Sequence, residues 1–110
     1  MAKKDKPYFH KESGITFTNQ IQLFEYIWET RPHVSEVSGN RLPYKGHPQW
    51  HWCFAHILSK GAYPSTRLIP ENIILLTPEE HDLQETFLEF KERKEKLKQK
   101  YYSENQIKKL

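Results

Sequence analysis

The sequence NIILLTPEEHDLQE, at residues 72–85, decides the fold. It opens with an aliphatic and β-branched run, which predicts a buried strand. Thr77 then offers a side chain that can cap a helix, Pro78 suits the first helical position, and Glu80 completes the pattern of a capping box. The segment therefore predicts a strand that passes directly into a helix.

A second strand is predicted upstream, at residues 50–57, because WHWCFAHI contains no turn-forming residue. Strict alternation would place four side chains on one face of that strand: Trp50, Trp52, Phe54 and His56. This face either packs in the core, which we prefer, or stacks on nucleobases. Residues 59–71 contain glycine and proline, so a long loop should join the two strands.

A helix is predicted before the strand pair. Thr18 can cap its N-terminus, and Pro32 prevents its continuation. Apolar residues recur between these limits at helical spacing: Ile21, Phe24, Ile27 and Trp28. Residues 1–16 are polar and lysine-rich and are predicted to form a flexible arm, whereas residues 33–48 are rich in turn formers and suit a short hairpin with irregular connections.

The helix that starts at Pro78 is expected to carry an apolar stripe of Leu83, Phe87 and Phe90 and to run into a basic tail. Residues 91–110 hold eight Lys and Arg against three Glu, whereas residues 1–90 hold nine against eleven acidic residues. The tail is either a solvated helix or an arm that contacts phosphates. Six basic residues are candidate nucleic-acid contacts: Lys60, Arg67, Lys91, Arg93, Lys94 and Lys98.

The composition suits one small domain with an aromatic core. The chain has 110 residues, of which 28% are charged and 14% aromatic, and its mean hydropathy is −0.87. The expected fold class is α+β, with an arm at residues 1–16, a domain at residues 17–90 and a basic helical tail at residues 91–110. Helix, strand pair and capped helix should all belong to the central domain.

The single cysteine, Cys53, excludes an intrachain disulfide and a zinc site built from cysteine pairs. The sequence has no apolar run long enough to span a membrane, and no apolar region follows the charged N-terminus as it would in a signal peptide. We therefore expect an intracellular protein in a reducing compartment that does not bind membranes.

Polar residues that can carry chemistry gather around the strand pair. His56 ends the first strand, Asn72 begins the second, and His81 lies in the first turn of the helix that follows. Glu85 lies four residues after His81, so the two should share one helix face and could hold a cation between them. For any single histidine a structural role is the alternative, and His33, His47 and His51 are assigned to the surface or to packing.

These segments resemble a known family. CFAHILSKG at residues 53–61 and ENIILLTPEEHDLQE at residues 71–85 resemble the HNH, or ββα-metal, endonucleases. SEVSGNRL at residues 35–42 resembles the element that precedes their site, so the resemblance covers about residues 33–90. It implies a ββα-metal core with a preceding packing helix and a long basic C-terminal helix.

The resemblance also implies roles for individual residues. His56 would be the general base, Asn72 would orient that base or contact the metal, and His81 would be a metal ligand. Glu85 falls where some members carry a second ligand on the helix. The implied cofactor is one divalent ion, with Mg²⁺ or Mn²⁺ preferred and Zn²⁺ or Ni²⁺ as alternatives.

The sequence departs from the family pattern at two places. Ala55 stands where many members have an aspartate or histidine that binds the metal, although some members also have alanine there. Ser35 and Ser38 stand where many members have a cysteine pair for a structural zinc. The metal would then rely on fewer protein ligands, and packing would have to replace the zinc.

The implied activity is hydrolysis of DNA phosphodiester bonds. Neutral His56 would take a proton from water, the hydroxide would attack phosphorus, and the metal would stabilise the leaving 3′ oxygen. The alternative is a catalytically weak or inactive nucleic-acid-binding module, or a small subunit of a larger nucleoprotein complex. The expected partner is double-stranded or structured DNA, with a dimer or partner protein supplying specificity, in a bacterium or a phage-infected host.

Overall fold

The computed structural model describes residues 6–109, with side chains up to residue 101. Short strands and helices follow one another in this order: β1 (Tyr8–His10), β2 (Ile15–Phe17), α1 (Gln20–Thr30), the 3-10 helix η1 (Trp50–Cys53), β3 (Phe54–His56), the 3-10 helices η2 (Pro64–Thr66) and η3 (Pro70–Asn72), β4 (Ile73–Leu75), α2 (Pro78–Asp82), the 3-10 helix η4 (Gln84–Thr86) and α3 (Leu88–Lys109). The expected α+β class is confirmed.

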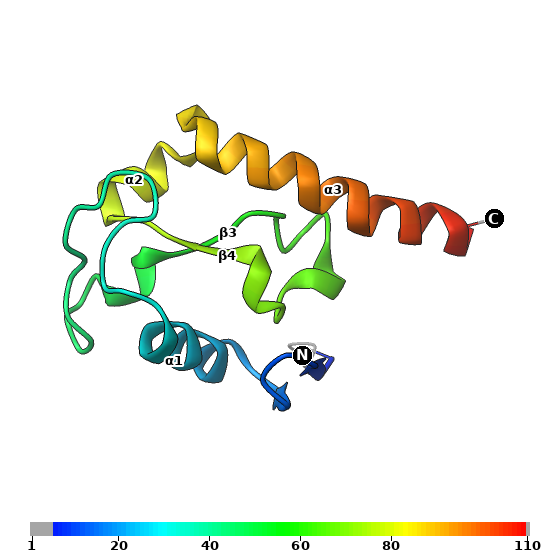
Figure 1. Ribbon diagram of the computed structural model, residues 1–110, viewed down its shortest axis with the longest axis horizontal. Helices are drawn as coiled ribbons and strands as arrows, with labels where there is room; N and C mark the ends of the chain where they lie inside the picture. The colour runs from blue at the N-terminus through cyan, green and yellow to red at the C-terminus, as the bar shows by residue number, and fades with distance from the viewer. Residues whose placement is uncertain (1–5, 110) are drawn as a thin grey trace.

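The antiparallel pair β3–β4 forms the centre of the fold, between α1 on one side and α3 on the other (Figure 1). Ile73 and Leu75 pack in the cluster that contains the buried face of α1, whereas Ile74 and Leu76 pack in the cluster around Phe90 of α3. Successive side chains of a strand point to opposite faces. Residues 73–76 are continuously apolar because helices cover both faces of this strand pair.

Aromatic rings fill the α1 side of the core. Phe24 of α1 stacks on Phe54 of β3 with ring centroids 4.2 Å apart, and Trp28 meets Trp50 edge-on at 5.7 Å. The opposite side is made from aliphatic residues and Phe90, and the fully buried Ala55 belongs to it. Ala55, at the position where many HNH endonucleases have a metal-binding residue, therefore lies in the core, on the face of the strand that packs toward α3.

The N-terminal arm was expected to be flexible, but its described part forms a β-hairpin. β1 and β2 pair as an antiparallel hairpin, in which Tyr8 lies opposite Phe17. His10 is buried, and its Nδ1 lies 2.7 Å from Ser13 Oγ while its Nε2 lies 3.0 Å from Glu71 Oε2. Strands this short carry too little alternation to be recognised in a sequence, and residues 1–5 lie outside the described part.

Helix α1 begins one residue later than predicted. Asn19, not Thr18, is its N-cap, because the Asn19 side chain accepts a hydrogen bond of 2.8 Å from the Gln22 N–H. The helix ends at Thr30, shortly before Pro32. Ile21 was expected in the apolar stripe but is exposed, and Leu23 is buried in its place.

The first half of the predicted strand at residues 50–57 is instead the 3-10 helix η1. The Trp50 N–H donates to His47 O and the Trp52 N–H to Gln49 O, both at 3.0 Å. Trp50 is consequently buried while Trp52 is 59% exposed, so the expected common aromatic face does not exist. Only Phe54–His56 are extended.

The capping box of α2 is confirmed. The Thr77 N–H donates to Glu80 Oε1 at 2.8 Å, and the Glu80 N–H donates to Thr77 Oγ1 at 3.2 Å. Burial alone would raise the pKa of the Glu80 carboxyl. Hydrogen bonds from Ser35, Ser38 and Thr77 lower this pKa by more than burial raises it, so the net shift is downward. The two serines at the cysteine positions thus tie their turn to the start of α2.

The long helix predicted from Pro78 onward is interrupted. α2 ends at Asp82, η4 follows, and α3 starts only at Leu88. The Thr86 side chain donates to Leu83 O at 2.6 Å and Phe87 is extended, so the chain leaves the α-helical path between the two helices. Leu83 is exposed, while Phe90 is fully buried.

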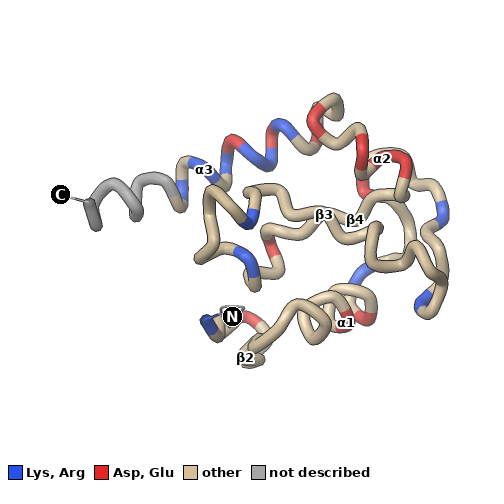
Figure 2. Tube along the Cα trace, turned by 180° about the vertical axis from the view of Figure 1, so that it is seen from behind, with Lys and Arg blue, Asp and Glu red and all other residues tan. Residues whose placement is uncertain are grey.

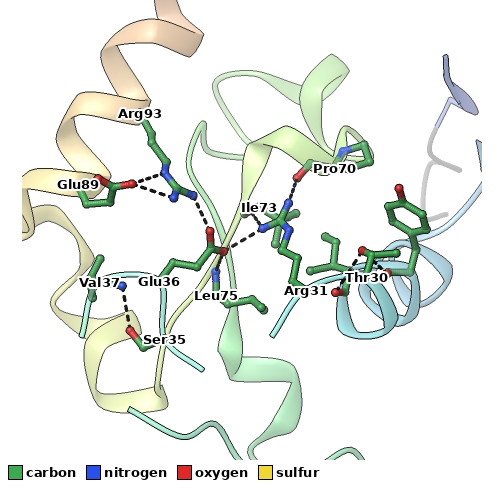
Figure 3. Close-up of polar contacts among 12 residues, drawn as sticks. Thr30, Arg31, Ser35, Glu36, Val37, Pro70, Ile73, Leu75, Glu89 and Arg93 are labelled. Carbon is green, nitrogen blue, oxygen red and sulfur yellow. Dashed lines mark hydrogen bonds and ion pairs between the residues drawn. The ribbon is translucent and has the colours of Figure 1, made fainter. Parts of the chain in front are cut away.

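Glu36 joins the elements on both sides of the strand pair. Its carboxylate accepts hydrogen bonds from the Leu75 N–H at 2.7 Å and from the guanidinium groups of Arg31 and Arg93, each at 2.9 Å (Figure 3). Burial opposes ionisation of Glu36, but these three donors lower its pKa below the ordinary value. One carboxylate therefore connects the end of α1, β4 and α3.

Charges of both signs alternate on the first half of α3, between Glu89 and Lys96. Figure 2 shows Lys and Arg interleaved with Asp and Glu on the first half of this helix.

Within residues 6–109, the helices lack the combination of length and apolar composition that crossing a bilayer requires.

Candidate functional site

An open cleft of about 420 Å³ lies where the N-terminal end of α1 faces η1, the end of β3 and α2. Phe24 and Phe54 supply apolar wall. The polar residues that line it are three histidines, two glutamines, a serine and a lysine: His51, His56, His81, Gln20, Gln84, Ser59 and Lys60. The cleft therefore combines imidazoles with one positive charge.

His56 is held in one tautomer. Its Nε2 lies 3.1 Å from the carbonyl oxygen of Arg67, which can only accept, so Nε2 carries the hydrogen and Nδ1 keeps a free electron pair. Burial lowers the pKa of His56 to about 4, and the nearby charges of Lys60, Arg67 and His81 act in the same direction, against the hydrogen bond to Arg67. The ring is thus neutral at pH 7.

Asn72 is fully buried and bonded to backbone on both sides of the β3–β4 loop. Its Oδ1 accepts from the Leu58 N–H at 2.7 Å, and its Nδ2 donates to Leu58 O at 3.1 Å and to Thr66 O at 3.2 Å. The side chain of Asn72 is therefore inaccessible to a metal or a substrate. Its bond to Thr66 O fixes the backbone next to the Arg67 carbonyl, which is the partner of His56 Nε2.

His81 lines the cleft, whereas Glu85 is not among the residues that line it. α2 ends at Asp82, so the expectation that His81 and Glu85 share one helix face is wrong. The Glu85 carboxylate accepts a hydrogen bond of 3.0 Å from Lys94 Nζ, and the preceding residue, Gln84, faces the cleft instead. Burial lowers the pKa of His81. The negative charge of Asp82 raises this pKa and the positive charge of Lys60 lowers it, and the net shift is downward.

Sequence reasoning missed His51, Gln20 and Gln84 among the residues of the cleft. His51 was assigned to packing because a strand would have separated it from His56, but the 3-10 turn of η1 brings both to the same cleft. Gln20 and Gln84 each bury an Oε1 atom that has no hydrogen-bond partner among the described residues. No sequence pattern marks these glutamines, since their positions depend on where α1 and α2 begin and end.

Metal-type ligands converge elsewhere. Among the side chains of residues 6–101, the one group of three whose ligand atoms all lie within 4.8 Å of one another is His10, Glu12 and Glu71. None of these lines the cleft. His10 Nε2 lies 3.0 Å from a carboxylate oxygen of each glutamate, so this cluster attaches the β1–β2 hairpin to η3.

The candidate nucleic-acid contacts differ in their surroundings. Lys60 lines the cleft, and Lys91 is exposed on α3. Arg93 and Lys94, in contrast, form ion pairs within the chain, with Glu36 and Glu89 for Arg93 and with Glu85 for Lys94. To contact phosphates, these two side chains would have to exchange their present partners, and the expectation stays a prediction. Lys98 is half-buried, and Arg67 places its backbone carbonyl against His56.

Comparisons of the chain with protein-family models, with curated proteins and with solved structures give no match. The resemblance of residues 33–90 to HNH endonucleases stays a prediction. What the structure shows is an antiparallel strand pair followed by a capped helix, with His56 and His81 on one cleft.

Acidification should destabilise the fold through His56. Its pKa in the folded chain, about 4, lies below the ordinary value of 6.5, so its contribution is fully present above pH 6.5 and is lost as the pH falls through 4. Between pH 7.5 and pH 5 this group alone should lower the free energy of unfolding by about 2 kcal/mol. Urea unfolding of the wild type and of His56→Gln at both pH values measures it, and an identical pH dependence in the two proteins would contradict the assignment.

Proposed function

We propose that the cleft hydrolyses phosphodiester bonds of DNA with His56 as the general base. The observation that carries this proposal is the hydrogen bond of 3.1 Å between His56 Nε2 and Arg67 O. It leaves Nδ1 unprotonated and fixes the plane of the ring beside a lysine, in a cleft open to solvent. A neutral, oriented imidazole next to a positive charge suits removal of a proton from water beside a phosphate.

In this proposal each side chain has one task. His56 Nδ1 takes the proton of the attacking water, and the Arg67 carbonyl stabilises the imidazolium that forms. The negative phosphate would also raise the pKa of His56 from its value in the free chain, which makes it a stronger base when substrate is bound. Lys60 attracts the phosphate and neutralises part of its charge. Asn72 holds the loop that supplies the Arg67 carbonyl.

The cleft offers imidazole nitrogens to a divalent cation, and this donor set favours some ions over others. His81 and His51 offer imidazoles, and Gln84 could add a neutral oxygen only if its buried Oε1 turned toward the cleft. When bound, the ion would stabilise negative charge on the leaving 3′ oxygen. Because the described residues that line the cleft include no carboxylate, imidazole-accepting ions such as Mn²⁺, Ni²⁺ or Zn²⁺ suit it better than Mg²⁺.

A plasmid-nicking assay tests this proposal. Supercoiled DNA should become nicked or linear with Mn²⁺ or Ni²⁺ and stay intact in EDTA. His81→Ala should raise the metal concentration for half-maximal cleavage by about 10-fold or more, since one protein ligand is lost. His47→Ala, which removes a histidine outside the cleft, is the matched control. Metal dependence that is the same in His81→Ala and wild type would remove His81 from the site.

A second candidate function is a nucleic-acid-binding module without turnover, or a small subunit of a larger nucleoprotein complex. The absence of a carboxylate among the described residues that line the cleft favours it, since cation affinity would then be low. This candidate predicts DNA binding that persists in EDTA and no cleavage with any of the metals. The same plasmid assay, combined with a gel-shift titration, separates the two functions.

A further inference from the structure

Trp52 differs from the other tryptophans in its environment. It is 59% exposed, whereas Trp28 and Trp50 are almost completely buried in the core. The 3-10 turn of η1 causes this difference, because it turns Trp52 away from the neighbours that bury Trp50. Trp52 therefore presents a large apolar ring to solvent.

The position of this ring links it to the proposed site. Trp52 lines the same cleft as His56, Lys60 and His81, and its ring meets that of His81 edge-on with centroids 5.9 Å apart. Exposed aromatic residues also occur elsewhere on the chain, at Phe9 and Tyr44, so exposure alone does not indicate a binding role. What distinguishes Trp52 is an exposed ring on the wall of a cleft that also carries three histidines and a lysine.

We infer that Trp52 stacks on an unpaired nucleobase of the strand that occupies the cleft. This inference rests on the proposed function, and it names the substrate class: DNA with at least one unstacked base next to the scissile phosphate, as in a single-stranded region, a gap or a flap. In a duplex both faces of every internal base are covered by its neighbours, so a protein ring finds a free base face where a base has left the stack or where a strand ends.

Two further side chains are suited to the same base. Gln20 and Gln84 line the cleft, and each has a buried Oε1 without a hydrogen-bond partner among residues 6–101. Because these Oε1 atoms are buried, each carboxamide would have to turn toward the cleft to bind the edge of a base, and it would then gain the partner that its Oε1 lacks. Carboxamides form such bonds with base edges. The cleft thus offers a stacking face, hydrogen-bonding groups for a base and a positive charge for its phosphate.

The test compares oligonucleotides that have the same charge but differ in their bases. The full chain is titrated in EDTA, so that no cleavage occurs, with a labelled oligothymidylate of about eight nucleotides and with an abasic oligonucleotide of equal length. Fluorescence anisotropy gives the affinities, and intrinsic tryptophan fluorescence reports stacking. We expect binding about 5- to 150-fold tighter when the bases are present, together with quenching.

Variants assign this difference to Trp52. Trp52→Ala should abolish the preference for the base-bearing strand, Trp52→Phe should retain part of it, and Tyr44→Ala, which removes an exposed ring outside the cleft, should leave it unchanged. An equal loss of affinity for both oligonucleotides in Trp52→Ala would mean that the ring only supports His81 and would overturn the inference. Equal binding of both oligonucleotides by the wild type, or binding of neither, would overturn it as well.

The outcome is independent of turnover. If the chain shows the base preference but cuts no DNA with any metal, the stacking role stands and the proposed hydrolysis fails. If the chain cuts DNA but Trp52→Ala processes gapped and fully duplex substrates in the same ratio as the wild type, the hydrolysis stands and the stacking role is wrong.

Discussion

Replacing His56 by alanine is expected to lower the rate of DNA cleavage by about 10²- to 10⁴-fold, the range typical of removing a general base. The variant keeps the cleft but loses the only nitrogen whose proton position is set by the Arg67 carbonyl. Rates measured under single-turnover conditions at saturating metal separate this loss from weaker metal binding.

His56→Gln is the more demanding control for the same prediction. Its amide N–H could retain a hydrogen bond to Arg67 O, but a carboxamide cannot take a proton from water at neutral pH. It should therefore be as inactive as His56→Ala while staying folded by circular dichroism. Cleavage by either variant at the wild-type rate would show that His56 is not the base.

Replacing Glu36 by alanine is expected to lower the free energy of unfolding by about 3 kcal/mol. The side chain of Glu36 is only 22% exposed, and its removal leaves Arg31, Arg93 and the Leu75 N–H without their acceptor. Breaking a half-buried charge network is more costly than removing a surface pair, because the partner charges stay behind in a poorly solvated place. Urea denaturation at pH 7.5 measures the change.

Two variants calibrate this effect. Glu36→Gln keeps an acceptor for the Leu75 N–H but removes the charge, so its loss should be intermediate. Glu25→Ala removes an exposed pair, since Glu25 and Lys45 are each close to half-exposed, and should cost less than about 1 kcal/mol. Similar losses in Glu36→Ala and Glu25→Ala would show that the network of Figure 3 does not hold α1, β4 and α3 together.

Element boundaries that depend on contacts between neighbouring residues were predicted more accurately than the extent of the elements. The end of α1 before Pro32 and the capped start of α2 at Thr77 were predicted correctly, because a proline ring and a capping box act over a few neighbouring residues. The strand predicted for residues 50–53 and the continuous helix after Asp82 were wrong. Both predictions extended a periodic pattern across a point where tight turns interrupt the backbone.

The candidate site was predicted only in part, for a related reason. His56 and His81 were placed correctly on one cleft, because a strand end and a capped helix start are close to each other in a strand–loop–strand–helix unit. Glu85 was predicted from helical spacing and is turned away from the cleft, where Gln84 takes its place. His51 was dismissed on the basis of strand geometry that the chain does not adopt there.

The sequence by itself determined that residues 73–82 form an aliphatic strand followed at once by a capped helix, since the capping contacts lie within residues 77–80 and the strand follows from its apolar composition. Only the tertiary structure decided which basic residues remain available to a partner. Arg93 is engaged by Glu36, which lies 57 positions earlier, and the same carboxylate binds the Leu75 N–H 39 positions away. Contacts across such separations depend on how the two helices pack around β3–β4, and no local pattern contains that information.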